Sequence, residues 1–239
     1  VGSGKSSLLQ SLLAEMYKHS GTVTIDQQQR MAYVSQQAWI QNLSLRDNIL
    51  FGLPYDQRKY DQVISACALK PDFEMLSGGD QTEIGEKGIN LSGGQKQRVS
   101  IARACYSNSN LFLFDDPLSA VDSHVGKHIF DQVISSQSGI LRDHTRVLVT
   151  NALYVLPFVD QVIMIKNGRI EDVGTYQTLM TSNESFQELI HNYAKANQDD
   201  DDDDHHLDME RKKSHFFFFF LNYGNFFSFF LLLQCPNLM

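Results

Sequence analysis

Two neighbouring carboxylates, Asp115 and Asp116, directly follow the apolar run 111–114 and precede Pro117. A short apolar run of this kind is typical of a buried strand, and a buried carboxylate is costly unless a cation or a proton accompanies it. A carboxylate at the end of such a strand suits a Mg²⁺ ion that is held partly through water. We therefore expect Asp115 to be a Mg²⁺ ligand, and Asp116 is a candidate catalytic base.

The first seven residues, VGSGKSS, match the end of the phosphate-loop pattern G-x-x-x-x-G-K-[ST]. Glycines let the backbone close around phosphate oxygens, and the N–H groups of the loop and of the next helix start offer oriented donors. The lysine supplies a charge for the outer phosphates, and the serine hydroxyl after it suits Mg²⁺. The expected nucleotide-binding residues here are Gly2, Ser3, Gly4, Lys5, Ser6 and Ser7, with Ser6 also a Mg²⁺ ligand.

A second glycine-containing stretch, LSGGQKQRVSIARA at residues 91–104, predicts another anion site. Ser92, Gly93 and Gly94 bring a hydroxyl and bare backbone N–H groups to an expected helix start. Two phosphate-contacting sites in one chain cannot normally reach one nucleotide unless a second domain faces it. Together with the phosphate loop, this motif resembles the signature of the nucleotide-binding domain of ATP-binding cassette (ABC) transporters, and the resemblance covers residues 1 to about 195.

The resemblance implies an α/β P-loop NTPase fold. This fold would have a mainly parallel sheet, a small antiparallel β part that is truncated here, and a helical signature subdomain at about residues 43–106. It also implies ATP and Mg²⁺ as cofactors. The implied partners are a second cassette and transmembrane domains, and the cassette would lie on the cytoplasmic face of a membrane.

The resemblance also assigns roles to further residues. Gln36, in the Q-loop, would contact Mg²⁺ and the attacking water and would link to the membrane domains. The signature residues Ser92, Gly93, Gly94 and Gln95 would bind nucleotide, and the D-loop at 119–122 would cross between paired domains. Arg98 is expected to be a solvated or dimer-face charge.

Three stretches are similar in sequence to the multidrug-resistance-associated (C) subfamily, and more narrowly to the first of its two cassettes. They are QQAWIQNLSLRDNILFG, DDPLSAVDSHVGKHIF and VLPFVDQVIMIKNGRI. This similarity implies a cassette of an exporter for organic anions or drug conjugates. The subfamily also contains regulatory cassettes that gate a channel or a partner, so that alternative stays open. A DNA-maintenance ATPase would need a long coiled coil between Lys5 and Leu91, for which there is no room.

Two residues depart from the pattern of active cassettes. Asp116 stands where most carry a glutamate as general base, and Asn151 stands where the family carries a switch histidine. Aspartate is one methylene shorter, and a misplacement of about 1 Å can cost roughly 10²-fold in rate. Asparagine can donate to a γ-phosphate but lacks the imidazole's second nitrogen. We therefore expect Asp116, Gln36 and Asn151 to form a catalytic set that holds ATP and hydrolyses it poorly.

The elements that must position these residues alternate between strands and helices, which favours a mainly parallel sheet. The strands are expected at 22–25, 31–34, 111–114 and 146–150, and a hairpin at 161–165 and 169–173 flanks Asn167-Gly168. The helices are expected at 6–16, 56–69, 94–106, 125–134, 175–180 and 184–193, with a further turn at Pro71.

Composition changes sharply after the expected cassette at 1–195. Residues 196–215 read as an acidic, polar linker, and residues 216–239 form a Phe/Leu-rich tail that is either a membrane segment or non-native sequence. The net charge of −8 argues against a nucleic-acid partner, and three widely spaced cysteines indicate reduced thiols. Because Val1 interrupts the phosphate loop, we expect a fragment or an inactive truncated product that binds Mg-ATP weakly or not at all.

Overall fold

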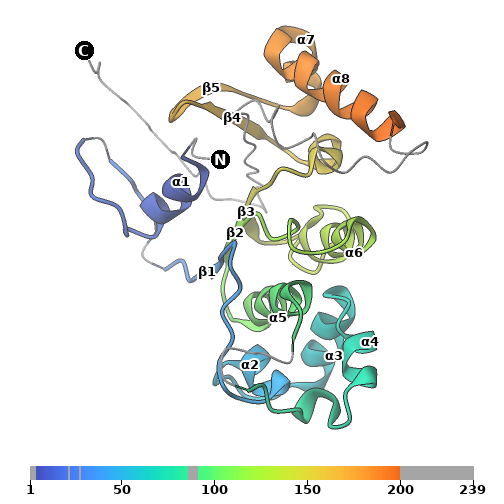
Figure 1. Ribbon diagram of the computed structural model, residues 1–239. Helices are drawn as coiled ribbons and strands as arrows, with labels where there is room; N and C mark the ends of the chain where they lie inside the picture. Colours follow the sequence, from blue (N-terminus) through green and yellow to red (C-terminus); the bar gives the residue numbers. More distant parts are fainter. Residues whose placement is uncertain (1–3, 21, 27, 86–90, 200–239) are drawn as a thin grey trace.

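The structure is a computed structural model that describes residues 4–20, 22–26, 28–85 and 91–199 (Figure 1). Gly2, Ser3 and the expected tail at 216–239 lie outside the described residues, as does most of the expected linker. None of the helices in the described part has both the length and the apolar character that a membrane crossing needs.

A parallel sheet of three strands in the order β1-β2-β3 forms the centre of the fold. The strands are β1 (Met31–Val34), β2 (Leu111–Asp115) and β3 (Thr145–Val149). All five residues of β2 are buried, as expected for a strand covered on both faces. The register places Asp115 beside Val149, so the first carboxylate lies at the carboxyl end of the central strand. The predicted α/β fold with a mainly parallel sheet is confirmed.

The two faces of the sheet carry separate hydrophobic clusters, because side chains alternate along a strand. On one face, Leu9 and Leu12 of α1 (Lys5–Leu12) pack with Leu111, Leu113 and other residues of one buried cluster. The opposite face of β2 belongs to the larger cluster, which α5 (Gly93–Tyr106) and α6 (Ser123–Ile129) help to build.

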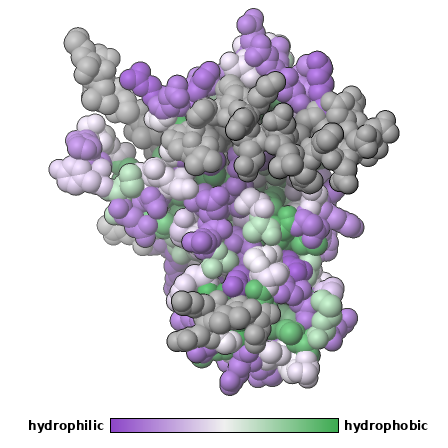
Figure 2. Space-filling model, in the orientation of Figure 1, coloured by the Kyte–Doolittle hydropathy of each residue, from purple (hydrophilic) through white to green (hydrophobic). Residues whose placement is uncertain are grey.

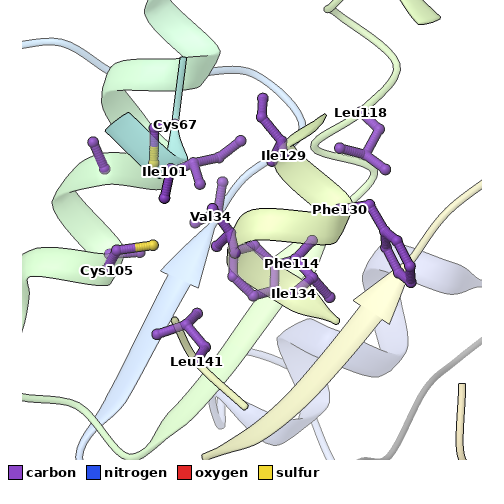
Figure 3. Close-up of a cluster of buried hydrophobic side chains, with 14 of the residues drawn as sticks. Val34, Cys67, Ile101, Cys105, Phe114, Leu118, Ile129, Phe130, Ile134 and Leu141 are labelled. Carbon is purple, nitrogen blue, oxygen red and sulfur yellow. The ribbon is translucent and has the colours of Figure 1, made fainter. Parts of the chain in front are cut away.

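Figure 3 shows part of this larger cluster, with Phe114 of β2 among side chains from several helices. Cys67 and Cys105 are buried within it as free thiols. The described residues visible in Figure 2 are mostly hydrophilic, with small separate hydrophobic patches.

Short helices gather beside α5 in the lower part of the view in Figure 1. They are α2 (Leu45–Leu50), α3 (Gln57–Ala66), α4 (Lys70–Met75) and the 3-10 turn η1 (Gly79–Gln81). Ser44 and Asp56 cap α2 and α3 by accepting hydrogen bonds from backbone N–H groups three residues ahead. Pro71 lies in the first turn of α4, where its missing N–H costs nothing.

The chain after β3 forms a hairpin and two more helices. The antiparallel strands β4 (Val162–Lys166) and β5 (Arg169–Gly174) are joined by Asn167 and Gly168, both with positive φ, as the Asn-Gly signal predicts. A 3-10 helix, η4 (Leu153–Phe158), precedes them, and α7 (Tyr176–Ser182) and α8 (Glu184–Asp199) follow.

Two expectations about elements are wrong. Residues 22–25 form no strand, since Thr22, Val23 and Thr24 are exposed and no strand among the described residues pairs with them. The helix expected over 125–134 changes after Ile129 into a π-helical turn, η3 (Phe130–Ile134). The α-helix α2 had no counterpart among the expected elements.

Candidate nucleotide-binding site

The first carboxylate of the site, Asp115, is 3% exposed and only partly satisfied. Its Oδ2 accepts a hydrogen bond from the Tyr33 hydroxyl at 3.3 Å, whereas its Oδ1 is buried without a hydrogen-bond partner. Burial, followed by the charge and the hydrogen bond of Asp115, raises the pKa of Tyr33 to about 12. Tyr33 therefore stays a neutral donor. An orphaned buried carboxylate oxygen is what a hard cation would use.

The donor set around Asp115 fits Mg²⁺ rather than a metal held in an all-protein cage. No group of three or more acidic, histidine or cysteine side chains in the described ranges could hold a metal ion. Mg²⁺ commonly takes one or two carboxylates and completes its shell with water and substrate phosphates. Asp115, with the Ser6 hydroxyl at the start of α1, would hold the ion in this way.

Asp116 and Asn151, the two departures from the family pattern, are in direct contact. The Asn151 Nδ2 donates to Asp116 Oδ2 at 2.8 Å, and the Asn151 backbone N–H donates to Asp116 Oδ1 at 3.3 Å. The Asp116 backbone N–H in turn donates to the Val149 carbonyl at 2.8 Å, and Asp116 has a left-handed φ of 49°. Both carboxylate oxygens of Asp116 are thus engaged by one neighbour.

The surroundings of Asp116 raise the pKa of its carboxyl group. Burial raises its pKa above the ordinary carboxyl value, and the charge of Asp115 raises it further. The hydrogen bonds from Asn151 and the charge of Lys5 act in the opposite direction and offset the effect in part. The structure therefore brings Asp115, Asp116, Asn151 and the phosphate-loop lysine into one electrostatic neighbourhood.

The phosphate loop enters α1 through Gly4, whose φ of 93° is strained for any other residue. The first turn of α1 contains Lys5, Ser6 and Ser7, and the backbone N–H groups of a first helical turn have no partner within their own helix. A helix start of this kind suits an anion, and Lys5 is near enough to Asp116 for its charge to lower the pKa of that carboxyl group.

Gln36 lies two residues beyond the end of β1, in an exposed connection. The connection is anchored from α5, because the buried Gln97 donates through Nε2 to the Ser35 carbonyl at 3.2 Å. Val34 pairs with Phe114, so Gln36 follows the same sheet edge as Asp115. Gln97 was not predicted, and nothing in its spacing distinguishes it from the other polar residues of the helix.

The signature residues begin α5 with a capping box. Ser92 Oγ accepts from the Gln95 backbone N–H at 3.1 Å, and Gln95 Oε1 accepts from the Ser92 backbone N–H at 2.8 Å. Ser92 and Gly93 are exposed, so this helix start lies at the surface of the described structure. Gly94 packs against the D-loop, since a Cβ there would lie 3.0 Å from the Ala120 carbonyl oxygen.

Arg98, expected to be a solvated or dimer-face charge, is instead a structural ion-pair partner. Its side chain is 15% exposed, and its Nη1 lies 2.7 Å from Asp72 Oδ2. The prediction failed because the partner, Asp72 on α4, is 26 positions away in the sequence, and only the fold brings the two side chains together. Tyr33 was also missed, although it pairs with Leu113 and thus lies on the strand face that Asp115 shares two residues later.

Comparison with known proteins places the chain in a family. The family described as "ABC transporter" matches residues 1–119. The chain is 57% identical over 190 residues to "ABC transporter C family member 8" of Dictyostelium discoideum, covering 80% of this chain and 12% of that protein. It is 54% identical over 199 residues to "Multidrug resistance protein mrp-7" of Caenorhabditis elegans, covering 83% and 13%.

A human relative gives the same result. The chain is 56% identical over 194 residues to "ATP-binding cassette sub-family C member 3" of Homo sapiens, covering 81% of this chain and 12% of that protein. The chain thus spans about an eighth of the length of these curated relatives. The chain belongs to the ABC transporter family, as a nucleotide-binding domain of the C-subfamily type.

Proposed function

We propose that this chain is the first ATP-binding cassette of a membrane exporter for organic anions or drug conjugates. It binds Mg-ATP at an interface with a second cassette and hydrolyses it weakly at its own site. The observation that carries this proposal is the buried, unpaired Oδ1 of Asp115 at the carboxyl end of β2. A buried carboxylate oxygen without a donor is costly unless a cation or a proton accompanies it, and a Mg²⁺ ion bound with the phosphates would supply the cation.

Binding would use the residues of the first turn of α1. Gly4, Lys5, Ser6 and Ser7, preceded by Gly2 and Ser3, would surround the phosphates with backbone N–H groups, and Lys5 would add its charge. The Mg²⁺ ion, when bound, would neutralise phosphate charge. Asp115 would hold that ion from the sheet side, with Gln36 approaching from the connection after β1.

Weak hydrolysis follows from the state of Asp116. A general base must accept a proton from a positioned water, within about 2.6–3.2 Å of it. Asp116 is 3% exposed, and Asn151 engages both of its oxygens. The aspartate side chain is also one methylene shorter than glutamate, so its carboxylate would reach less far toward the attacking water. Asp116, Gln36 and Asn151 would therefore hold the attacking water poorly.

A second cassette is proposed as the partner of the signature residues. Ser92, Gly93, Gly94 and Gln95 begin α5, which packs beside the D-loop with its first residues exposed. An exposed anion site suits a nucleotide that another cassette holds. Each nucleotide would then be closed in by one phosphate loop and one signature.

Transmembrane domains are proposed as the second partner, with the cassette on the cytoplasmic face. Trp39 and Phe51 are 55% and 50% exposed, and their rings lie over the Arg103 guanidinium at 5.3 and 5.1 Å. Phe51 has a φ of 47°, an uncommon conformation for a bulky residue. Exposed aromatic side chains that are held over a cation are suited to docking.

Substitution of Lys5 in a full-length transporter that carries this cassette tests the proposal. Lys5→Ala should lower labelling of this cassette by a photoreactive Mg-ATP analogue by about tenfold or more, because a charge-assisted contact to phosphate is lost. Lys127→Ala, which removes an exposed cation of α6, is the matched control and should label as wild type does. Equal labelling of Lys5→Ala and wild type would refute nucleotide binding at this loop.

A regulatory cassette that gates a channel or a partner is the second candidate. The observation that favours it is the Asp116–Asn151 contact, since a cassette that binds and rarely hydrolyses ATP is suited to sensing. Inside-out vesicles distinguish the two functions. ATP-dependent uptake of an anionic conjugate supports the exporter, whereas a nucleotide-gated current without uptake supports the regulator.

A further inference from the structure

We infer that Asp72, on α4, is a positioning residue for the signature. It fixes the side chain of Gln95, and through that side chain it fixes the Ser92 backbone N–H at the start of α5. This inference rests on the proposed function, in which that helix start meets the phosphate of a nucleotide held by a second cassette.

Gln95 is the connecting side chain. Its Oε1 accepts from the Ser92 backbone N–H at 2.8 Å, and its Nε2 donates to Asp72 Oδ1 at 2.8 Å. An ionised carboxylate only accepts hydrogen bonds, so the NH₂ end of the amide must face Asp72. The oxygen end is then left for Ser92. The carboxylate on α4 thus decides which way the amide of the capping box points.

Asp72 can position Gln95 because burial and a contact with Arg98 hold its own side chain in place. The residue is 5% exposed. Arg98 Nη2 donates to Asp72 Oδ1 at 2.9 Å, and Arg98 Nη1 donates to the Ala68 carbonyl just after α3. Gln95 and Arg98 are three positions apart on α5, so both side chains can reach the same carboxylate from one helix face.

The geometry of the helix start explains why this connection bears on nucleotide. The D-loop leaves little room for a side chain at Gly94, whereas a Cβ at Gly93 would meet nothing within 4 Å. Ser92 is exposed, and the Gln95 Oε1 is the hydrogen-bond acceptor that holds its backbone N–H. A shift of about 1 Å in such donors can cost roughly 10²-fold in rate. Asp72 would therefore tune the neighbouring cassette's site without touching its nucleotide.

A charge exchange tests the inference in the full-length transporter. Gln95→Glu keeps the acceptor for the Ser92 N–H but sets a carboxylate against Asp72. We expect it to weaken Mg-ATP binding at the site that this signature completes by about tenfold or more. Adding Asp72→Asn should restore binding to within about threefold of wild type, because an asparagine there can donate to the new carboxylate and accept from Arg98. Glu74→Gln, an exposed acid on the same α4, is the matched control.

The readout is nucleotide labelling at each of the two sites separately. Loss at the partner's phosphate loop, with unchanged labelling at Lys5, supports positioning. Equal loss at both sites indicates a general folding defect and overturns the inference, as does a double variant that binds no better than Gln95→Glu. If wild type labels at neither site, it is the proposed function that fails.

Discussion

The two departures from the family pattern meet at a single carboxylate. Asp116 is buried, has a left-handed backbone and accepts two hydrogen bonds from Asn151. A left-handed φ in a non-glycine residue is kept only where the surrounding structure enforces it. The Asp116–Asn151 pair is therefore a built feature of the sheet edge, and the replacement of one partner alone would leave the other poorly matched.

Burial of Asp116 should make the stability of the domain depend on pH. Its pKa is raised, so the folded state takes up a proton at a higher pH than the unfolded state does. The contribution of Asp116 to stability is therefore greatest below its ordinary pKa and is lost as pH rises through the folded value. Asp116→Asn cannot titrate. We expect the melting temperature of wild type, relative to this variant, to increase as the pH is lowered from about 8 to about 4.

Thermal unfolding of the two proteins across that pH range, at constant ionic strength, measures the difference directly. A constant offset between them would show that Asp116 does not titrate abnormally. A difference with the opposite slope would mean that Asn151 and Lys5 outweigh the burial.

Among the elements, the contact between the signature helix and the D-loop is the tightest glycine-dependent one at the site. A Cβ at Gly94 would lie 3.0 Å from the Ala120 carbonyl oxygen and 3.7 Å from Val121 Cγ1. The near atom is backbone, so it cannot rotate away. The D-loop and the start of α5 therefore keep their spacing only because residue 94 has no side chain.

Gly94→Ala should consequently destabilise the domain, whereas Gly93→Ala should not. Overpacking of this kind costs about 1–3 kcal/mol, which corresponds to a fall of several degrees in melting temperature for a domain of this size. Gly93 is the matched control, since the same methyl group one position earlier meets nothing within 4 Å. Thermal unfolding of both variants is the measurement. Equal melting temperatures for the two would show that the D-loop moves freely to accept the methyl group.

The predictability of the elements follows the strength of local signals. The apolar run before Asp115 and the Asn167-Gly168 turn were sufficient to predict β2 and the hairpin, because both signals are local. Residues 22–25 have a strand-like composition but no partner strand in the part of the chain that the structure describes, and pairing cannot be read from composition. Helix α2 is six residues long, too short for a periodic pattern to reveal it.

For the site too, local features could be predicted from the sequence and contacts between distant residues could not. The residue types at 115, 116 and 151 could be selected from the sequence, but their contact could not, since it depends on β3 lying next to β2. The Asp72–Gln95–Arg98 connection likewise joins α4 to α5 across the fold. Residues that hold the reactive groups in place are dispersed along the chain, and only tertiary structure collects them.

For the whole molecule, the two helix starts that we propose to bind phosphate belong to different elements. One is the first turn of α1, beside Asp115, and the other is the first turn of α5, beside the D-loop. In the proposed assembly each would serve a different nucleotide, and only the first depends on Asp116. Turnover of the assembly should therefore be distributed unequally between its two sites.

This inequality can be measured with substitutions at one position in a full-length transporter that carries the cassette. Asp116→Asn should lower total ATP turnover far less than the matching substitution in the second cassette, because Asp116 contributes little as a base. Asp116→Glu should raise hydrolysis at this site, by up to about 10²-fold, because the longer side chain brings the carboxylate nearer to the water. Steady-state turnover together with site-resolved nucleotide trapping distinguishes the two sites. If Asp116→Asn lowered turnover as severely as its counterpart, Asp116 would be a working base, and the hydrogen bonds from Asn151 would orient it rather than restrain it.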